Sequence, residues 1–205
     1  MAQDIKPTRS ELMKLKKSIK LAVAGYNLLK KKRDGLILEF FETLKKAKSV
    51  RSELTTEYIK AERCINIAEA IDGALTVQSY AMALKDCPSI ELSSKNVMGV
   101  VVPKISATSV VKHMHQRGYG IIGSSSRIDE AAYAYEHVVE KIVVAAEVET
   151  TIIKLLNEIE KTKRRVNALE FSVIPKMKAQ AGFIRLRLEE MERENVFRLK
   201  RMKKS

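Results

Sequence analysis

The sequence contains no tryptophan, few other aromatic residues, only four prolines and only eight glycines. Aromatic residues make up 5% of the chain, whereas 45% of its residues are hydrophobic and 31% are charged. Scarce proline and glycine leave room for long uninterrupted helices, and the lack of large aromatics disfavours a globular α/β core. The composition therefore predicts a mainly α-helical protein and excludes a disordered tail.

Cysteine is scarce as well, since Cys64 and Cys87 are the only two. This number implies no disulfide framework, and we expect reduced thiols in a cytoplasmic setting. The first residues lack the apolar core of a signal peptide. No apolar run approaches the ~20 residues that a membrane-spanning helix needs. We therefore expect any membrane association to depend on a partner.

Positive charge is concentrated toward the two ends of the chain. Of a net charge of +13, residues 1–33 carry +8 and residues 193–205 carry +5, which leaves residues 34–192 neutral. Within the first segment, Lys30, Lys31, Lys32 and Arg33 form a basic block. Such a block suits an acidic protein surface or nucleic acid, although a solvated helix face is the simpler interpretation.

The first third of the chain shows apolar residues at alternating spacings of three and four. The positions of this first seam are Leu12, Leu15, Ile19, Ala22, Tyr26, Leu29, Arg33, Leu36, Phe40, Thr43, Ala47, Val50 and Leu54, continued by Ala61, Cys64, Ala68 and Ile71. A heptad pattern sustained over this length is typical of a coiled-coil helix. The charged exception, Arg33, must extend to solvent or pair across the coil, and we expect Glu170 as its partner.

The last third repeats the pattern. The positions of this second seam are Val148, Ile152, Leu155, Ile159, Thr162, Val166, Leu169, Val173, Met177, Ala181, Ile184, Leu188 and Met191. Two seams of matched length, each predicted to reach roughly 100 Å at 1.5 Å per residue, most simply fold back on each other. The sequence thus predicts a long antiparallel two-helix coiled coil with both termini at one end.

The second seam is irregular between Leu169 and Ala181, where three consecutive spacings of four residues occur. Extra spacing of this kind locally unwinds a supercoil. Pro175 lies in the same region and removes a helix hydrogen bond, so we expect a bend there. We also expect Pro175→Ala to alter function more than assembly.

The middle of the chain changes character, which gives three predicted regions. They are an N-terminal coiled-coil helix (1–72), a cap region with a short helix and a β-hairpin (73–125) and a C-terminal coiled-coil helix (126–205). The short helix is predicted to end before Pro88, and a strand within residues 96–105 to end at Pro103. A second strand is expected within residues 108–126, before a long helix that Ser126 caps with help from Asp129.

Residues 118–123 read Gly-Tyr-Gly-Ile-Ile-Gly and match the G-x-G-x-x-G fingerprint of dinucleotide-binding proteins. That fingerprint requires a buried strand before it and a helix that opens inside it. The preceding residues 112–117 are mostly polar, and the helix is predicted to begin only at Ser126. We interpret the match as a structural turn, and a dinucleotide-dependent enzyme remains a hypothesis that NADH titration tests.

Other candidate sites have weak patterns. His113 and His115 share one face of a predicted strand, but no cysteine or carboxylate at ligand spacing accompanies them. His137 and Cys64 fall at positions that suit packing. No arrangement of serine, histidine and aspartate, and no pair of carboxylates, points to catalysis. We therefore predict no catalytic, cofactor or metal site.

Two motifs carry a family resemblance. Residues 7–12 read Pro-Thr-Arg-Ser-Glu-Leu, residues 164–170 read Arg-Arg-Val-Asn-Ala-Leu-Glu, and Val173-Ile174-Pro175 follows. The chain closely resembles the D subunit of archaeal-type and vacuolar-type rotary ATPases over about residues 5–72 and 130–204, and more loosely between them. The stretch Lys178-Ala179-Gln180-Ala181-Gly182 is smaller and less polar than the family usually shows there.

The resemblance implies the central rotor shaft of an ATP synthase that couples to protons or sodium ions. It implies that the coiled coil enters a cylinder of A and B subunits, and that the middle region lies near the F subunit and the C subunit on the proteolipid ring. A non-catalytic, peripheral subunit on the cytoplasmic side of the cell membrane, without a cofactor, is expected. The positions that match family motifs or partner contacts are Arg9, Glu11, Arg164, Arg165, Asn167, Glu170, Pro175 and Arg198.

The charge distribution leaves one alternative from a different class, a basic coiled-coil protein that binds nucleic acid through residues 1–33 and 193–205. Such a protein would show an affinity that falls steeply with salt. The basic segments contain few interleaved aromatics, and no known nucleic-acid fold is recognisable. We therefore expect no nucleic acid among the partners, and no direct nucleotide.

Overall fold

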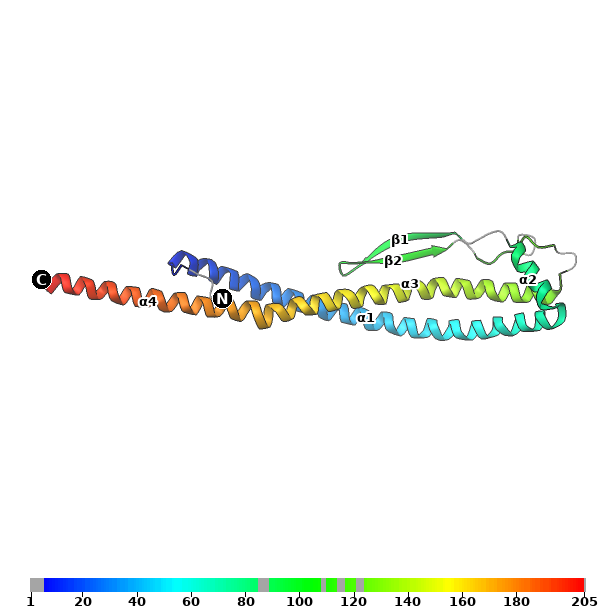
Figure 1. The fold of residues 1–205 in the computed structure, drawn as a ribbon, viewed down its shortest axis with the longest axis horizontal. Coiled ribbons are helices and arrows are strands. Elements are labelled where there is room, and N and C mark those ends of the chain that lie inside the picture. The colour runs from blue at the N-terminus through cyan, green and yellow to red at the C-terminus, as the bar shows by residue number, and fades with distance from the viewer. Residues whose placement is uncertain (1–5, 85–88, 108–109, 114–116, 121–123, 205) are drawn as a thin grey trace. The chain divides into compact units, whose positions relative to one another are not determined.

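The computed structural model describes residues 6–84, 89–107, 110–113, 117–120 and 124–204 (Figure 1). Its elements in chain order are α1 (Arg9–Asp72), α2 (Ala74–Ala83), β1 (Ile90–Val97), β2 (Val100–Ala107), α3 (Ser126–Ala168), the π-helical turn η2 (Leu169–Val173) and α4 (Ile174–Lys204). The predicted fold class, long helices with a small β-hairpin, is confirmed.

Helix α1 begins where the sequence supplies a cap. The Thr8 hydroxyl accepts a hydrogen bond from the backbone N–H of Glu11 at 3.2 Å and so satisfies a donor that the helix leaves free. The helix continues for 64 residues and ends before Gly73, whose φ of 85° turns the chain toward α2. The short helix predicted within residues 73–89 is confirmed as α2.

The chain forms two compact units, the first made of residues 1–35 and 159–205 and the second of residues 36–158. In the first unit, the start of α1 lies beside α4, since Arg9 pairs with Glu192. Leu12 and Leu188 line one open hollow between these two helices. Among the described residues of this unit, the buried side chains are Thr162, Val166, Ile174 and Ile184.

In the second unit, α1 and α3 run antiparallel. Glu39 and Thr43 of α1 line the same hollow as Leu155 of α3, and further along α1 Ala68 lines another with Ala131. Lys141 and Glu53 form an ion pair of 2.7 Å between the two helices. The core at the α2 end consists of Ala68, Tyr119 and Ile128, with Val77, Tyr80 and Ala83 of α2 packed against it.

Burial follows the two predicted seams with three exceptions. All first-seam positions from Leu12 to Ala68 are partly or fully buried. Three predicted seam residues are exposed instead, Ile71 by 61%, Val173 by 39% and Met191 by 40%. Ile71 lies in the last turn of α1, and Met191 lies one residue before the ion pair at Glu192. Val173 lies in η2 and has a separate cause, described with the site below.

The β-hairpin differs from the prediction. Val97 and Val100 pair across a two-residue turn in which Met98 has φ 50° and Gly99 has φ 85°. Two positive φ values in succession are the mark of a type I′ turn, which matches the twist of the flanking strands. The stretch predicted as a single strand, residues 96–105, therefore contains the end of β1, the turn and most of β2.

The strand was predicted to end at Pro103. Instead, Pro103 lies inside β2 opposite Ser94. Proline is tolerated there because its missing N–H would have pointed away from β1. The second strand was predicted within residues 108–126; of these residues, 110–113 and 117–120 form no strand, and 108–109, 114–116 and 121–123 lie outside the described residues.

Helix α3 begins at Ser126, as predicted, but Ser125 supplies the cap. The Ser125 hydroxyl accepts a hydrogen bond from the backbone N–H of Arg127 at 3.2 Å. Asp129, which the sequence suggested as a capping carboxylate, accepts a hydrogen bond from the Tyr119 hydroxyl at 2.6 Å. The prediction for Ser126 and Asp129 was wrong because a partner from the preceding loop occupies Asp129.

Across the described part of the chain, no helix combines the length and the apolar character needed to cross a membrane.

Candidate functional site

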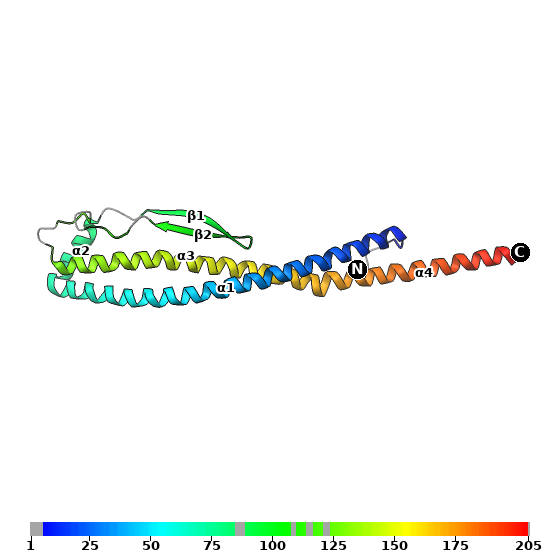
Figure 2. The same cartoon turned by 180° about the vertical axis from the view of Figure 1, so that it is seen from behind.

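The end of α4 extends past the start of α1 (Figures 1 and 2). Arg9 pairs with Glu192, and every described side chain from Arg193 to Lys203 is exposed. The basic residues of this segment lie among exposed apolar ones, of which Phe197 is 73% and Met202 is 74% exposed. We call residues 193–204 the tip. The two basic ends of the chain are thus staggered within the first unit.

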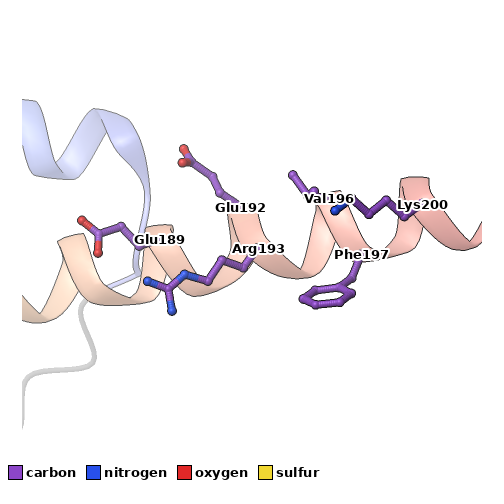
Figure 3. A pocket seen from close by; sticks show the side chains of 6 residues that line it. All are labelled: Glu189, Glu192, Arg193, Val196, Phe197 and Lys200. Atoms are coloured by element: carbon purple, nitrogen blue, oxygen red, sulfur yellow. The ribbon is translucent and has the colours of Figure 1, made fainter.

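An open hollow lies along the start of the tip and the helical turn before it, as drawn in Figure 3. Its lining residues are Glu189, Glu192, Arg193, Val196, Phe197 and Lys200. Glu192 and Val196 project from one side of the helix, and the Phe197 ring projects from the opposite side. A single helix with carboxylates, cations and apolar groups in alternation offers a protein-contact surface, because it encloses no volume that would bury a small ligand.

The motif segment, residues 164–170, presents charged groups on the outside of the first unit. Arg164 pairs with Glu160 one turn earlier and remains 77% exposed. Arg165, Asn167 and Glu170 are exposed as well. On the same helix, Val166 is buried, so the motif combines one core residue with an outward polar face.

The π-helical turn η2 explains the irregular second seam. The backbone N–H of Ile174 donates to the carbonyl of Leu169, five residues earlier, which accommodates one extra residue. Ile174 is therefore buried at 9% exposure, and the predicted seam residue Val173 is 39% exposed. Pro175 follows at once; a wider turn before it relieves the clash of its ring with an earlier carbonyl.

The sequence predicted that Arg33 pairs with Glu170, and this prediction is wrong. The Arg33 guanidinium binds the carboxylate of the adjacent Asp34, with an N···O distance of 2.8 Å. The Arg33 side chain is 26% exposed, so its aliphatic part lies against the helix pair and its charged end reaches solvent. Two other predicted contact residues form ion pairs within their own helices. Glu11 pairs with Lys14, and Arg198 pairs with Glu194.

A buried polar network in the second unit was missed by sequence reasoning. Arg117 is 4% exposed and donates from Nε and Nη2 to the two carboxylate oxygens of Glu136, at 2.9 and 3.0 Å. Tyr119 donates to Asp129, and Glu136 also accepts the backbone N–H of Lys112. The network fastens the chain before α3 onto α3. The sequence signal was Arg-Gly-Tyr shortly before a helix that carries one carboxylate in its first turn, Asp129, and another about three turns in, Glu136.

Gly118 lies between these two buried side chains and has a φ of 83°. A Cβ at this position would lie 3.3 Å from the carbonyl oxygen of Ala83. The first glycine of the G-x-G-x-x-G match is thus required by a tight turn against α2. Residues 121–123, which end the motif, lie outside the described residues.

The network shifts two pKa values. Burial raises the pKa of Tyr119, and its hydrogen bond to Asp129 acts in the same direction. For Arg117, burial acts to lower the pKa but is outweighed by the hydrogen bonds to Glu136 and Tyr119, so the pKa is raised. Arg117 therefore stays charged in the core, and Tyr119 stays protonated.

Tyr119→Phe is expected to reduce the loss of stability at alkaline pH. The folded chain holds the phenolic proton above the ordinary pKa of 10.0, whereas the unfolded chain releases it near that value. The free energy of unfolding should thus be independent of this group below pH 10 and fall as the pH rises further. Urea unfolding between pH 9 and 11 measures the slope, and an equal slope in both proteins would contradict the assignment.

The other candidates from the sequence are placed as follows. His137 lies 3.4 Å from Glu140 and packs edge-on against Tyr133, and Cys64 is a partly buried free thiol on α1. His113 is exposed, and His115 lies outside the described residues. No group of three or more metal-binding side chains occurs within the described ranges.

These features define a protein of paired long helices with a small β-hairpin and an exposed tip at the end of α4. The family model for the ATP synthase D subunit matches residues 11–204. The A-type ATP synthase D subunit of Methanococcoides burtonii is 63% identical over 204 residues, which cover 100% of this chain and 99% of that protein. The chain belongs to the ATP synthase D-subunit family.

Two further relatives carry the same name. The A-type ATP synthase D subunit of Methanosarcina acetivorans is 62% identical over 201 residues, 98% of this chain and 96% of that protein. The protein of Halorubrum lacusprofundi is 51% identical over 203 residues, 99% of this chain and 89% of its own length. The similarity therefore includes the cap region as well as both long helices.

Proposed function

We propose that the chain is the central rotor shaft of an A-type ATP synthase, which transmits torque between an ion-translocating ring and the catalytic subunits. The carrying observation is similarity over the whole chain to proteins named as the D subunit of the A-type ATP synthase. The paired helices supply the stiffness that a shaft needs. The nucleic-acid alternative gains no support from the family or from these relatives.

The proposed partners at the first unit are the catalytic A and B subunits. The surface of this unit exposes Phe171, Phe183 and Phe197 as well as cations such as Arg164. An uneven surface of this kind favours different conformations of the surrounding subunits in turn as it rotates. Coupling then equals the difference in contact free energy between those conformations. In this proposal the chain holds no catalytic group, cofactor or nucleotide.

The proposed partners of the cap region (73–125) are the F subunit and the C subunit that links to the proteolipid ring. The two helical regions (1–72 and 126–205) then form the shaft. The chain would be peripheral on the cytoplasmic side of the membrane and held there by these partners.

Reconstitution tests the proposed function directly. Subunits of the synthase are purified without this chain, and ATP-driven ion pumping in vesicles is measured before and after the chain is added back. We expect pumping only when the chain is present, and recovery of the chain with the A and B subunits. Equal ATP-driven ion pumping without the chain would contradict the proposal. Recovery of the chain with nucleic acid alone would contradict it as well.

Deletion of Ser172 is expected to lower the number of ions pumped per ATP by roughly half or more, while assembly is retained. The deletion removes the extra residue of η2, so the turn becomes α-helical with Ile174 four residues after Leu169, and the wide turn that shapes the helix before Pro175 is lost. Pro175→Ala, which keeps the residue count, serves as the control and should have the smaller effect. Equal coupling in the deletion variant and the wild type would argue against a role for η2.

A further inference from the structure

Positive charge in the first unit is concentrated in two segments that lie side by side. Residues 12–33 of α1 and residues 171–188, from the end of η2 through the first half of α4, contain twelve lysines and arginines and no aspartate or glutamate. The whole chain has a net charge of +13, so all its other residues together carry only +1. Figures 1 and 2 both show the start of α1 beside α4, and Leu12 and Leu188 line one hollow. We call these two segments the basic band.

The band repels itself in the isolated chain. Its cations nearest the borders pair with acids outside it, Lys14 with Glu11, Arg33 with Asp34, Arg185 with Glu189 and Arg187 with Glu190. Further inside the band, Lys16 and Lys20 lie one helical turn apart on α1, and both are exposed. Like charges at this spacing destabilise a helix, and an acidic partner removes that repulsion.

Large apolar side chains lie exposed in the same band. Leu21 and Leu28 are 73% and 69% exposed, and their spacing of seven residues places them on one side of α1, two turns apart. On α4, Phe183 and Leu186 are 53% and 61% exposed. The phosphates of a nucleic acid are bound by cations and polar donors, whereas apolar and aromatic groups beside cations are typical of a protein interface. The band therefore fits a partner that is both acidic and apolar.

Two glycines of the band leave space that the chain does not fill. A Cβ added at Gly25 or at Gly182 would have nothing within 4 Å outside its own stretch of helix. Glycine inside a helix is less favourable than alanine, so packing within the chain gives no reason for either glycine. Gly25 lies between Leu21 and Leu28 on the same side of α1. The missing side chain lets a second helix approach α1 closely at this point.

We propose that the basic band binds an acidic amphipathic helix of another protein chain, which packs over Gly25 between Leu21 and Leu28. Apolar side chains of that helix contact the two leucines, and its carboxylates contact the surrounding lysines. The inference rests on the proposed function for the identity of that chain, which is then a catalytic subunit. A second copy of this chain does not fit, because two basic bands repel each other.

Binding of the chain to synthase that has been depleted of it tests the role of charge. Lys17→Glu combined with Lys178→Glu is expected to raise the Kd at least about tenfold. Lys45→Glu combined with Lys48→Glu is the matched control, because it changes the net charge equally in the second unit, and it should bind like the wild type. All four lysines are exposed, so the helices persist in both variants. Wild-type binding by the first variant, or an equal loss in the control, overturns the inference and leaves the proposed function standing. Failure of the wild type to bind overturns both.

Photocrosslinking in the assembled synthase identifies the occupant. A photoreactive side chain in place of Leu28 is expected to label a helical segment that has more acidic than basic residues, and a labelled segment without this excess overturns the inference. Gly25→Leu should raise the Kd at least about tenfold, because its side chain fills the point of close approach. The same variant should unfold at an equal or higher temperature than the wild type, since leucine favours a helix more than glycine does. Wild-type binding by Gly25→Leu overturns the inference.

Nucleic acid is the competing occupant of a basic surface. An RNA of about 30 nucleotides is expected to bind the wild type at least about tenfold more weakly than the depleted synthase does. RNA that binds as tightly as the synthase, and is released by Lys17→Glu with Lys178→Glu, overturns the inference.

Discussion

Glu136→Ala is expected to lower the free energy of unfolding of the second unit by about 3 kcal/mol or more. The substitution removes the two carboxylate oxygens that accept from Nε and Nη2 of Arg117, a side chain that is 4% exposed and cannot lose its charge, and leaves the contacts of Nη1 with Asp129 and Tyr119. A buried guanidinium that loses its closest carboxylate costs far more than the net value of the original pair. The backbone N–H of Lys112 loses an acceptor at the same time. Denaturant unfolding followed by tyrosine fluorescence measures the change, since the chain has no tryptophan.

Glu140→Ala provides the matched control one turn further along α3. Glu140 is 42% exposed and lies 3.4 Å from His137, so its removal should cost less than about 1 kcal/mol. Replacement of Arg117 and Glu136 together by apolar residues should recover much of the loss, because no uncompensated charge remains. The network would have no special role if Glu136→Ala and Glu140→Ala destabilised the chain equally.

The sequence allowed the helical part of the fold to be predicted because burial along a helix pair repeats with the period of the helix. That argument held from Leu12 to Ala68 and again at Leu155, Val166 and Ile184. The argument was wrong at Val173. The sequence shows the three spacings of four residues, but it does not show which backbone conformation accommodates them. An unwound supercoil and a π-turn both fit that pattern, and the choice between them depends on packing around Ile174 and Pro175.

Long-range partners could not be read from the sequence. The polar stretch around Arg117 suggested an exposed strand, because polarity predicts exposure on average. The structure buries Arg117 since the turn at Gly118 places it against carboxylates 12 and 19 residues later. The hairpin was predicted only in part, because its turn and its proline also depend on how the two strands pair. Met98-Gly99 is an uncommon type I′ pair, and Pro103 in a strand is explained only by the edge it occupies.

Ile184→Ala is expected to lower the free energy of unfolding of the first unit by about 3 kcal/mol. Ile184 is fully buried, and the other buried residues of this unit, Thr162, Val166 and Ile174, lie within three turns of helix before or after η2. The core is thus one side chain wide along the helix pair, and few neighbours can move into the cavity. Protease resistance of residues 174–204 and denaturant unfolding measure the loss.

Phe183→Ala separates the stability of the shaft from its contacts. Phe183 precedes Ile184 directly, yet it is 53% exposed, and the guanidinium of Arg187 lies over its ring at 5.6 Å from the centroid. Its removal should change the free energy of unfolding by less than about 1 kcal/mol. Under the proposed function, Phe183 instead contacts the catalytic subunits, so Phe183→Ala should lower ATP-driven pumping in a chain that is as stable as the wild type. If Phe183→Ala pumped normally and Ile184→Ala did not, stiffness of the helix pair, and not the contacts of its outer face, would limit the transmission of torque.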